Sequence, residues 1–228
     1  MAKWLIDPGH GGVDPGATYN NREEADDVLK LALKVGDLLK LNNENVYYTR
    51  TTDDTVSLSE RSSKENAGNY DYFVSIHRNA YQPEVAKGVE THIYAKGGIA
   101  EALATKVNNE IVKVGFVDRG VKISNFHVLR ETISPAILIE VGFIDNSMDN
   151  SIFDSKFDSI VKAIVAGCLA QIGKNINMPS EDNSSNEEIY YRCVTGSFKD
   201  RANAEARKAE LIARGYTDTF IDVYKKVK

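Results

Sequence analysis

The sequence predicts an α/β fold in which helices flank a mixed, mostly parallel sheet, followed by a small βαβ module at the carboxyl end. Short apolar runs alternate with amphipathic stretches along residues 1–173, which is typical of strands and helices in a layered fold. The composition then changes at residues 174–189, where Asn, Ser, Pro, Asp and Glu replace almost every apolar residue, so we expect a linker there. Residues 190–228 form the carboxyl-terminal module.

The first part of the chain predicts three strands and two helices. Residues 4–6 form a short apolar strand that ends at an Asp-Pro-Gly turn. Residues 24–41 place apolar side chains at intervals of three and four, the stripe of a helix that faces a core. A second strand at residues 46–48, a second helix at residues 57–67 and a third strand at residues 72–76 follow.

The next hundred residues continue the alternation. Residues 88–94 are expected to form a strand entered through a glycine, and residues 99–114 a helix with apolar residues every four positions. Residues 136–139 are a short apolar run, typical of a buried strand, and residues 153–172 are a helix built on seven apolar positions. A hydrophobic core explains these stripes without any cofactor.

Charge and hydropathy exclude some classes of partner. The net charge is −5 and the chain has no long basic run, which argues against nucleic-acid binding. Lys162, Gly167 and Gln171 interrupt the most apolar stretch, residues 160–172, so we expect no membrane insertion. The first ten residues hold one Lys and a three-residue apolar run, too short for a signal peptide, so we expect synthesis in the cytoplasm.

The two cysteines predict neither a metal knuckle nor a disulfide framework. Cys168 and Cys193 lie 25 positions apart, each among apolar or strand-like neighbours. We therefore expect two reduced, half-buried thiols.

Three predicted strands lead to polar residues that an apolar interior would reject. The run WLI leads to His10 through Asp-Pro-Gly, FVSI leads to His77, and AILI leads to Glu140. Ligands of open α/β sheets bind beyond the carboxyl ends of the strands, so parallel strands would bring these three side chains into one crevice. A buried, unpaired Glu140 would be costly, and a bound cation would remove that cost.

Two imidazoles and one carboxylate form a ligand set that zinc accepts while it keeps a fourth position open. Glu23 and Glu24 both follow the loop that begins at His10 and precede the first long helix, and the residues alone do not decide between them. The segment DPGHGG lacks the motifs of a phosphate-binding loop. We interpret the other two histidines, His92 and His127, as non-ligands.

Four segments resemble the signature blocks of the zinc-dependent N-acetylmuramoyl-L-alanine amidases of the family 3 type. They are WLIDPGHGGVDPGAT, Glu24 ahead of its helix, DYFVSIHRNA and PAILIEVGFIDN, and they occur in the family's order. The resemblance implies one Zn²⁺ per catalytic domain on His10, Glu24 and His77, with Glu23 as the fallback ligand, and a catalytic role for Glu140. It implies hydrolysis of the amide bond between N-acetylmuramic acid and L-alanine in bacterial peptidoglycan, which causes wall lysis.

The match departs from the family at the expected rim of the crevice. Residues 20–22 are Asn-Asn-Arg where the family usually has glycine, and Arg78 replaces a small residue. Arg78 is a candidate substrate-binding residue or a solvated side chain, and Asn79 either orients substrate or closes a turn. Asp7 and Asp14 are close enough in sequence to hold the imidazoles by hydrogen bonds.

Two other functions remain open from the residues. A zinc peptidase that cuts within the stem peptide would use the same metal and base. A wall-binding protein without activity is the second alternative. The fact that all four catalytic positions are filled argues against it. For the amidase, either release by a phage holin or lysis of the cell would bring the enzyme to the wall.

Residues 190–228 resemble the first half of a SPOR domain, a family that binds peptidoglycan. The resemblance rests on YYRCVTGSF, an alanine-rich helix and GYTDTFI. Nine Lys or Arg and five Asp or Glu give this module a net charge of +4, which leaves −9 for the rest of the chain. One βαβ unit leaves sheet edges unpaired, so we expect a homodimer through this module. A start at Met178 would yield the module alone, as 51 residues.

Overall fold

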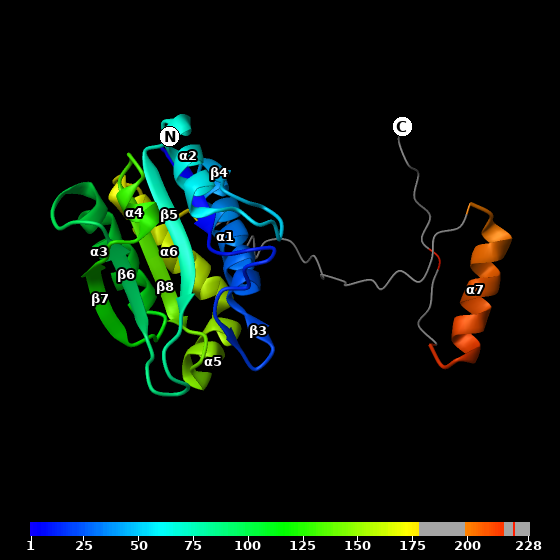
Figure 1. Ribbon diagram of the computed structural model, residues 1–228. Helices are drawn as coiled ribbons and strands as arrows, with labels where there is room; N and C mark the ends of the chain where they lie inside the picture. The colour runs from blue at the N-terminus through cyan, green and yellow to red at the C-terminus, as the bar shows by residue number, and fades with distance from the viewer. Residues whose placement is uncertain (178–198, 217–220, 222–228) are drawn as a thin grey trace. The chain divides into compact units, whose positions relative to one another are not determined.

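The computed structural model of the chain describes residues 1–177, 199–216 and 221. Six strands among these residues form one sheet, which Figure 1 shows with its flanking helices. The strands lie in the order β4 (Asn45–Tyr48), β1 (Lys3–Pro8), β5 (Tyr72–Asn79), β8 (Ala136–Phe143), β6 (Val89–Ile93) and β7 (Asp118–Ile123). The first four are parallel to one another, whereas β6 pairs antiparallel to β8 and parallel to β7. The sheet is therefore mixed and mostly parallel, as the sequence predicts.

Three long helices cover one face of this sheet. They are α1 (Glu24–Leu41), α3 (Gly98–Val112) and α6 (Phe157–Gln171). Their apolar stripes pack with side chains of the central strands, including Ile6, Ile76 and Ile139, in the main hydrophobic core. This packing explains why the helical periodicity is so regular in the sequence.

The other face is covered over only part of its area. The short helix α4 (His127–Arg130) packs with apolar strand residues in a second, smaller core, and α2 (Leu58–Gly68) lies beside α4. Alternate residues of a strand face the same side, so Leu5 shares this face with Asp7, and Leu138 shares it with Glu140. Each central strand thus changes from apolar to polar toward its carboxyl end, where the covering helices stop.

Shorter elements connect these layers. The hairpin of β2 (Thr18–Tyr19) and β3 (Arg22–Glu23) leads directly into α1, and α5 (Ser147–Ser155) joins β8 to α6. The predicted helix at residues 153–172 is therefore wrong at its start, because the chain leaves helical geometry at Lys156 and Phe153 belongs to α5.

Two further differences concern strands. β8 continues through Glu140 to Phe143, so this glutamate lies within a strand rather than beyond its end. Strand β7 has no counterpart among the predicted strands. Its residues are exposed or half-buried because β7 is an edge strand with one neighbour. An edge strand lacks the buried apolar run that identifies a central one.

The chain divides into two units, Met1–Glu181 and Asp182–Lys228. Residues 174–177, predicted as the start of the linker, contact the first unit. Lys174 forms an ion pair with the buried Glu44, and the backbone N–H of Asn177 donates to Asn42 Oδ1 at 2.6 Å. The remainder of the predicted linker lies outside the described residues.

In the second unit the structure describes the helix α7 (Arg201–Ala213), where the alanine-rich helix is expected. Asp200 caps it by accepting a hydrogen bond from the N–H of Ala202 at 2.7 Å. Residues 190–198 with Cys193, residues 217–220 of the segment predicted after the helix, and Met178 lie outside the described residues.

Cys168 is completely buried in α6 rather than half-buried. Burial disfavours the thiolate and raises the pKa of this thiol to about 12. No helix in the described part of the chain combines the length and hydropathy needed to cross a membrane.

Candidate metal centre and active site

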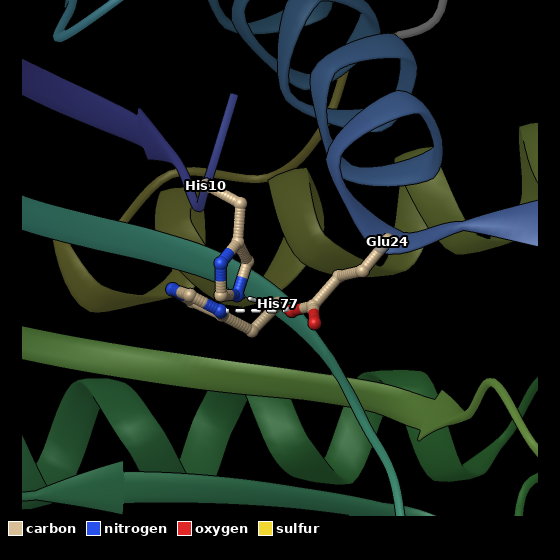
Figure 2. Close-up of side chains that lie close together, drawn as sticks. All are labelled: His10, Glu24 and His77. Carbon is tan, nitrogen blue, oxygen red and sulfur yellow. Dashed lines mark hydrogen bonds and ion pairs between the residues drawn. The ribbon is translucent and has the colours of Figure 1, made fainter. Parts of the chain in front are cut away.

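His10, Glu24 and His77 converge at the carboxyl edge of the sheet (Figure 2). Each offers one ligand atom, and these atoms lie within 4.8 Å of one another. Glu24 Oε1 is 3.2 Å from His10 Nε2 and 2.9 Å from His77 Nδ1. Glu23, the alternative carboxylate, is exposed and precedes the first turn of α1. The structure thus brings Glu24 to the two imidazoles.

The position of Glu24 is fixed by the backbone around it. Its Oε2 accepts a hydrogen bond from the N–H of Ala17, and its Oε1 accepts one from the N–H of Arg78 at 3.0 Å. Burial alone would raise the pKa of Glu24, but hydrogen bonds and charges from His10 and His77 outweigh burial and hold the pKa well below its usual range. The carboxylate is therefore ionised and able to bind a cation.

His10 has a left-handed backbone, with φ of 56°, which is uncommon for a residue other than glycine. Its Nδ1 lies 2.9 Å from Asp14 Oδ2, which leaves Nε2 directed toward Glu24. Burial lowers the pKa of His10, but Glu24 and Asp14 outweigh burial and raise it to about 9. Asp14 is thus the partner of this imidazole.

Asp7, the other aspartate considered for that role, holds no imidazole. It is buried and accepts hydrogen bonds from Thr49, Ser75 and Arg61 at 2.6 to 2.7 Å. Its role is to tie the end of β1 to its neighbours.

Two glycines leave room for the ligand side chains. A Cβ at Gly9 would lie 2.2 Å from His77 Cε1, and a Cβ at Gly16 would lie 2.7 Å from both Glu24 Oε2 and His10 Cδ2. Any larger residue at either position would displace a ligand. The glycines of this loop therefore serve close approach rather than phosphate binding.

Two buried arginines hold the same loop, and neither is among the residues predicted from the sequence. Arg50 donates to the carbonyl oxygens of Pro8 and Gly9, and Arg61 donates to those of Pro8 and His10. These bonds hold the backbone that carries the first ligand. An arginine within a polar stretch gives no local signal of such a role, because its partners lie 41 to 53 positions away.

Glu140 lies on β8 directly beside His77 in the β5–β8 ladder. Its Oε2 is buried and has no hydrogen-bond partner among the described residues. Burial raises the pKa of Glu140 to about 7, so this carboxyl group is able to accept and release a proton near neutral pH.

The structure corrects the interpretation of Arg78 as a solvated or substrate-binding side chain. Its side chain is 0% exposed, stacks on Phe153 and donates to Asp27 Oδ2 at 2.7 Å, so it supports the fold behind the site. Asn79 is half-buried, and its Nδ2 donates to Glu90 Oε1 at 2.9 Å.

The remaining histidines lie outside the cluster. His92 contacts Ser124 and Glu90, and His127 Nε2 lies 3.1 Å from Ser62 Oγ. In the part of the chain that the structure describes, His10, Glu24 and His77 form the one group suited to a metal ion. Two imidazole nitrogens and a carboxylate oxygen this close together fit Zn²⁺, and a nearby cation would stabilise the unpaired Glu140.

The arrangement of a His-Glu-His cluster beside a buried glutamate, on the open end of a sheet, defines a hydrolase site. The sequence profile of the N-acetylmuramoyl-L-alanine amidases matches residues 5–170. The chain therefore belongs to the N-acetylmuramoyl-L-alanine amidase family, as its four sequence blocks imply.

Three similar proteins agree with this assignment. The N-acetylmuramoyl-L-alanine amidase CwlM of Bacillus licheniformis is 37% identical over 220 residues, which cover 95% of this chain and 83% of CwlM. The endolysin of Bacillus phage SPP1 is 42% identical over 151 residues, 63% of this chain and 55% of the endolysin. The crystal structure of an N-acetylmuramoyl-L-alanine amidase from Clostridium difficile 630 has a TM-score of 0.71 and 38% identity, and covers 75% of this chain and 97% of that one.

The chain is thus a hydrolase that cleaves the amide bond between N-acetylmuramic acid and L-alanine in bacterial peptidoglycan.

Proposed function

We propose that this amidase depends on one Zn²⁺, held by His10, Glu24 and His77, and that Glu140 is its catalytic proton carrier. The observation that carries the proposal is the buried oxygen Oε2 of Glu140, which has no hydrogen-bond partner among the described residues, beside a compact set of three candidate ligands. A bound zinc ion at such a site polarises a carbonyl group and lowers the pKa of water.

The side chains divide the remaining work. Glu140 accepts a proton from the attacking water and passes it to the departing amine of L-alanine, as a base and then as an acid. Asp14 keeps the ring of His10 in the orientation that exposes Nε2. Asn79 borders the site from the end of β5, and we propose that it orients substrate.

The alternative of a peptidase that cuts within the stem peptide differs in the bond that it breaks. We expect digestion of purified cell walls to release new L-alanine amino termini without new reducing sugar ends. Glu140→Gln is expected to abolish this release, whereas Glu110→Gln on α3, away from the ligands, is expected to leave it intact. New amino termini from another residue of the stem would overturn the amidase mechanism, and lysis by Glu140→Gln would overturn the role of Glu140.

We further propose that residues 1–173 are the zinc amidase domain, that residues 174–189 are the linker, of which residues 174–177 contact this domain, and that residues 190–228 are a SPOR-like module that binds the wall and forms a homodimer. The similarity to CwlM over 95% of the chain extends into this module, and α7 lies where the module's helix is expected. The net charge of +4 would favour an anionic wall polymer. A fusion of residues 190–228 to a carrier protein is expected to sediment with purified walls.

The partner of the whole chain is peptidoglycan, and we propose that the enzyme reaches it after holin-type release or cell lysis. The similarity to a phage endolysin supports this route. Cell fractionation before and after lysis tests it, because enzyme in the wall fraction of intact cells would contradict the proposal.

A further inference from the structure

A second charged cluster adjoins Glu140 on the open face of the sheet. Glu90 on β6 is the partner of Glu140 in the antiparallel β6–β8 ladder, so the two side chains share one face. Glu90 Oε2 accepts hydrogen bonds from Arg119 Nε at 2.6 Å and from Lys122 Nζ at 2.5 Å. The same carboxylate holds Asn79 through its Oε1. Glu90 therefore links Arg119 and Lys122 of β7 to Asn79 of β5, the strand that also carries His77.

The cluster carries more positive than negative charge toward solvent. Glu90 is 4% exposed, whereas the side chains of Arg119 and Lys122 are 33% and 38% exposed. Burial would raise the pKa of Glu90, but its two cationic partners outweigh burial and lower it, so the carboxylate is ionised. Within Glu90, Arg119 and Lys122 the charges sum to +1, and the two exposed side chains are the positive ones.

The geometry of Arg119 leaves donors for a ligand. Its guanidinium lies 4.9 Å from the ring centre of Phe143 and uses Nε for Glu90. Among the described residues, its two terminal nitrogens donate no hydrogen bond. A guanidinium fixed at Nε and stacked on a ring presents a preorganised pair of donors, which suits a carboxylate.

We propose that Arg119 and Lys122 form a subsite for a carboxylate of the stem peptide, positioned by Glu90; this inference rests on the amidase mechanism proposed above. Neighbouring strands lie about 4.8 Å apart and an extended peptide advances about 3.3 Å per residue. The side chains of β7 that contact Glu90 therefore lie at a distance from Glu140 that an extended peptide spans in about two or three residues. The ligand is a carboxylate one or two residues beyond L-alanine, and the subsite determines specificity rather than catalysis.

A purely structural role is the competing explanation, because the same ion pairs attach the edge strand β7 to β6. The two roles differ in what they predict for substrates. A structural defect would reduce activity toward every substrate in parallel, whereas loss of the subsite would reduce only the preference for acidic stems.

The test uses the full chain and two soluble probes: an N-acetylmuramoyl tripeptide with free carboxyl groups, and the same fragment with its carboxyl groups converted to carboxamides. We expect the wild type to prefer the acidic fragment in kcat/KM by about tenfold, mostly through KM, as one charge-assisted contact would give. Arg119→Gln and Lys122→Gln are expected to lose most of this ratio, and Arg119→Lys to regain part of it. Lys113→Gln, directly after α3, also removes an exposed cation and is expected to keep the ratio.

Calorimetry of both fragments with the zinc-loaded wild type and the same variants separates the two proposals. Preferential binding of the acidic fragment without hydrolysis of either would refute the amidase mechanism and support the subsite. Equal kcat/KM and equal binding for the two fragments in the wild type would overturn the subsite, as would variants that keep the wild-type ratio. Thermal denaturation of each variant shows whether it is folded. If Lys122→Gln is unfolded, Lys122→Met replaces it.

Discussion

At the scale of single residues, a one-residue shift separates a member of the His-Glu-His cluster from an exposed side chain. Glu23 and Glu24 are adjacent, but only Glu24 starts α1, and the first turn of that helix directs its carboxylate between the two imidazoles. Glu23 has no such contact and is exposed. The two positions therefore form a matched pair for testing the ligand set.

We expect Glu24→Ala to lower bound zinc well below one ion per chain, because the two imidazoles alone make a weak site. Glu23→Ala is expected to retain one ion, since its side chain lies outside the cluster. Elemental analysis after dialysis measures both. Chelation is expected to abolish wall lysis and added Zn²⁺ to restore it. Zinc loss in Glu23→Ala with full retention in Glu24→Ala would contradict the assignment, and full activity without metal would contradict zinc dependence.

The sequence predicted the residues of the His-Glu-His cluster better than the residues that hold them in place. His10 and His77 follow apolar strands, and this local pattern is visible without a structure. Arg50, Arg61 and Glu90 act through partners that only folding brings near, and their flanking residues resemble those of any solvated charge. A local pattern identifies a side chain that leaves a strand, but it does not show which distant backbone that side chain supports.

At the scale of elements, Arg78 joins β5 to α1. Its guanidinium is completely buried and pairs with Asp27, which also pairs with Arg22 of the hairpin before α1. Burial lowers the pKa of Arg78, so the ion pair offsets a real desolvation cost. This connection aligns the strand that carries His77 with the helix that begins at Glu24.

We expect Asp27→Ala to reduce the free energy of unfolding by about 3 kcal/mol or more, because it leaves the buried Arg78 without its carboxylate. Asp37→Ala on the same helix is the control. The Asp37 side chain is 62% exposed in its ion pair with Lys40, so its loss should change stability by less than about 1 kcal/mol. Urea denaturation of both variants measures the difference, and equal effects would show that the buried pair does not stabilise the fold.

Cys168 tests the packing of α6 on the sheet. Because its thiol is completely buried and has a pKa of about 12, we expect no alkylation of Cys168 at pH 8 in the folded protein. Addition of denaturant is expected to make the same thiol react, as measured by mass spectrometry of the peptide that contains it. Rapid alkylation without denaturant would show that α6 opens locally.

The elements themselves were predictable where one face is buried. Residues 24–41 were predicted with the bounds that α1 has, because its apolar stripe faces the main core. The break at Lys156 was missed because apolar residues continue through it, so periodicity alone joined α5 to α6. Strand β7 lies at the edge of the sheet, so it lacks the buried apolar stripe from which the other elements could be predicted.

At the scale of the whole molecule, the position at which the chain is truncated decides whether the catalytic unit keeps its contacts with residues 174–177. The contacts of Lys174 with Glu44 and of Asn177 with Asn42 belong to the catalytic unit. A truncation after residue 173 would remove both and leave the buried Glu44 with less compensation. The boundary that preserves the catalytic unit therefore follows residue 177.

We expect the full chain to be a dimer at micromolar concentration and residues 1–177 to be an active monomer. A βαβ unit of about 40 residues is near the size at which a domain needs a partner to fold, and pairing with an identical unit would complete its sheet. Light scattering on the full chain and on residues 1–177 measures the masses, and wall lysis by the truncated form shows that its site is intact. A monomeric full chain would refute pairing through residues 190–228, and a dimeric truncation would move the interface to the catalytic unit.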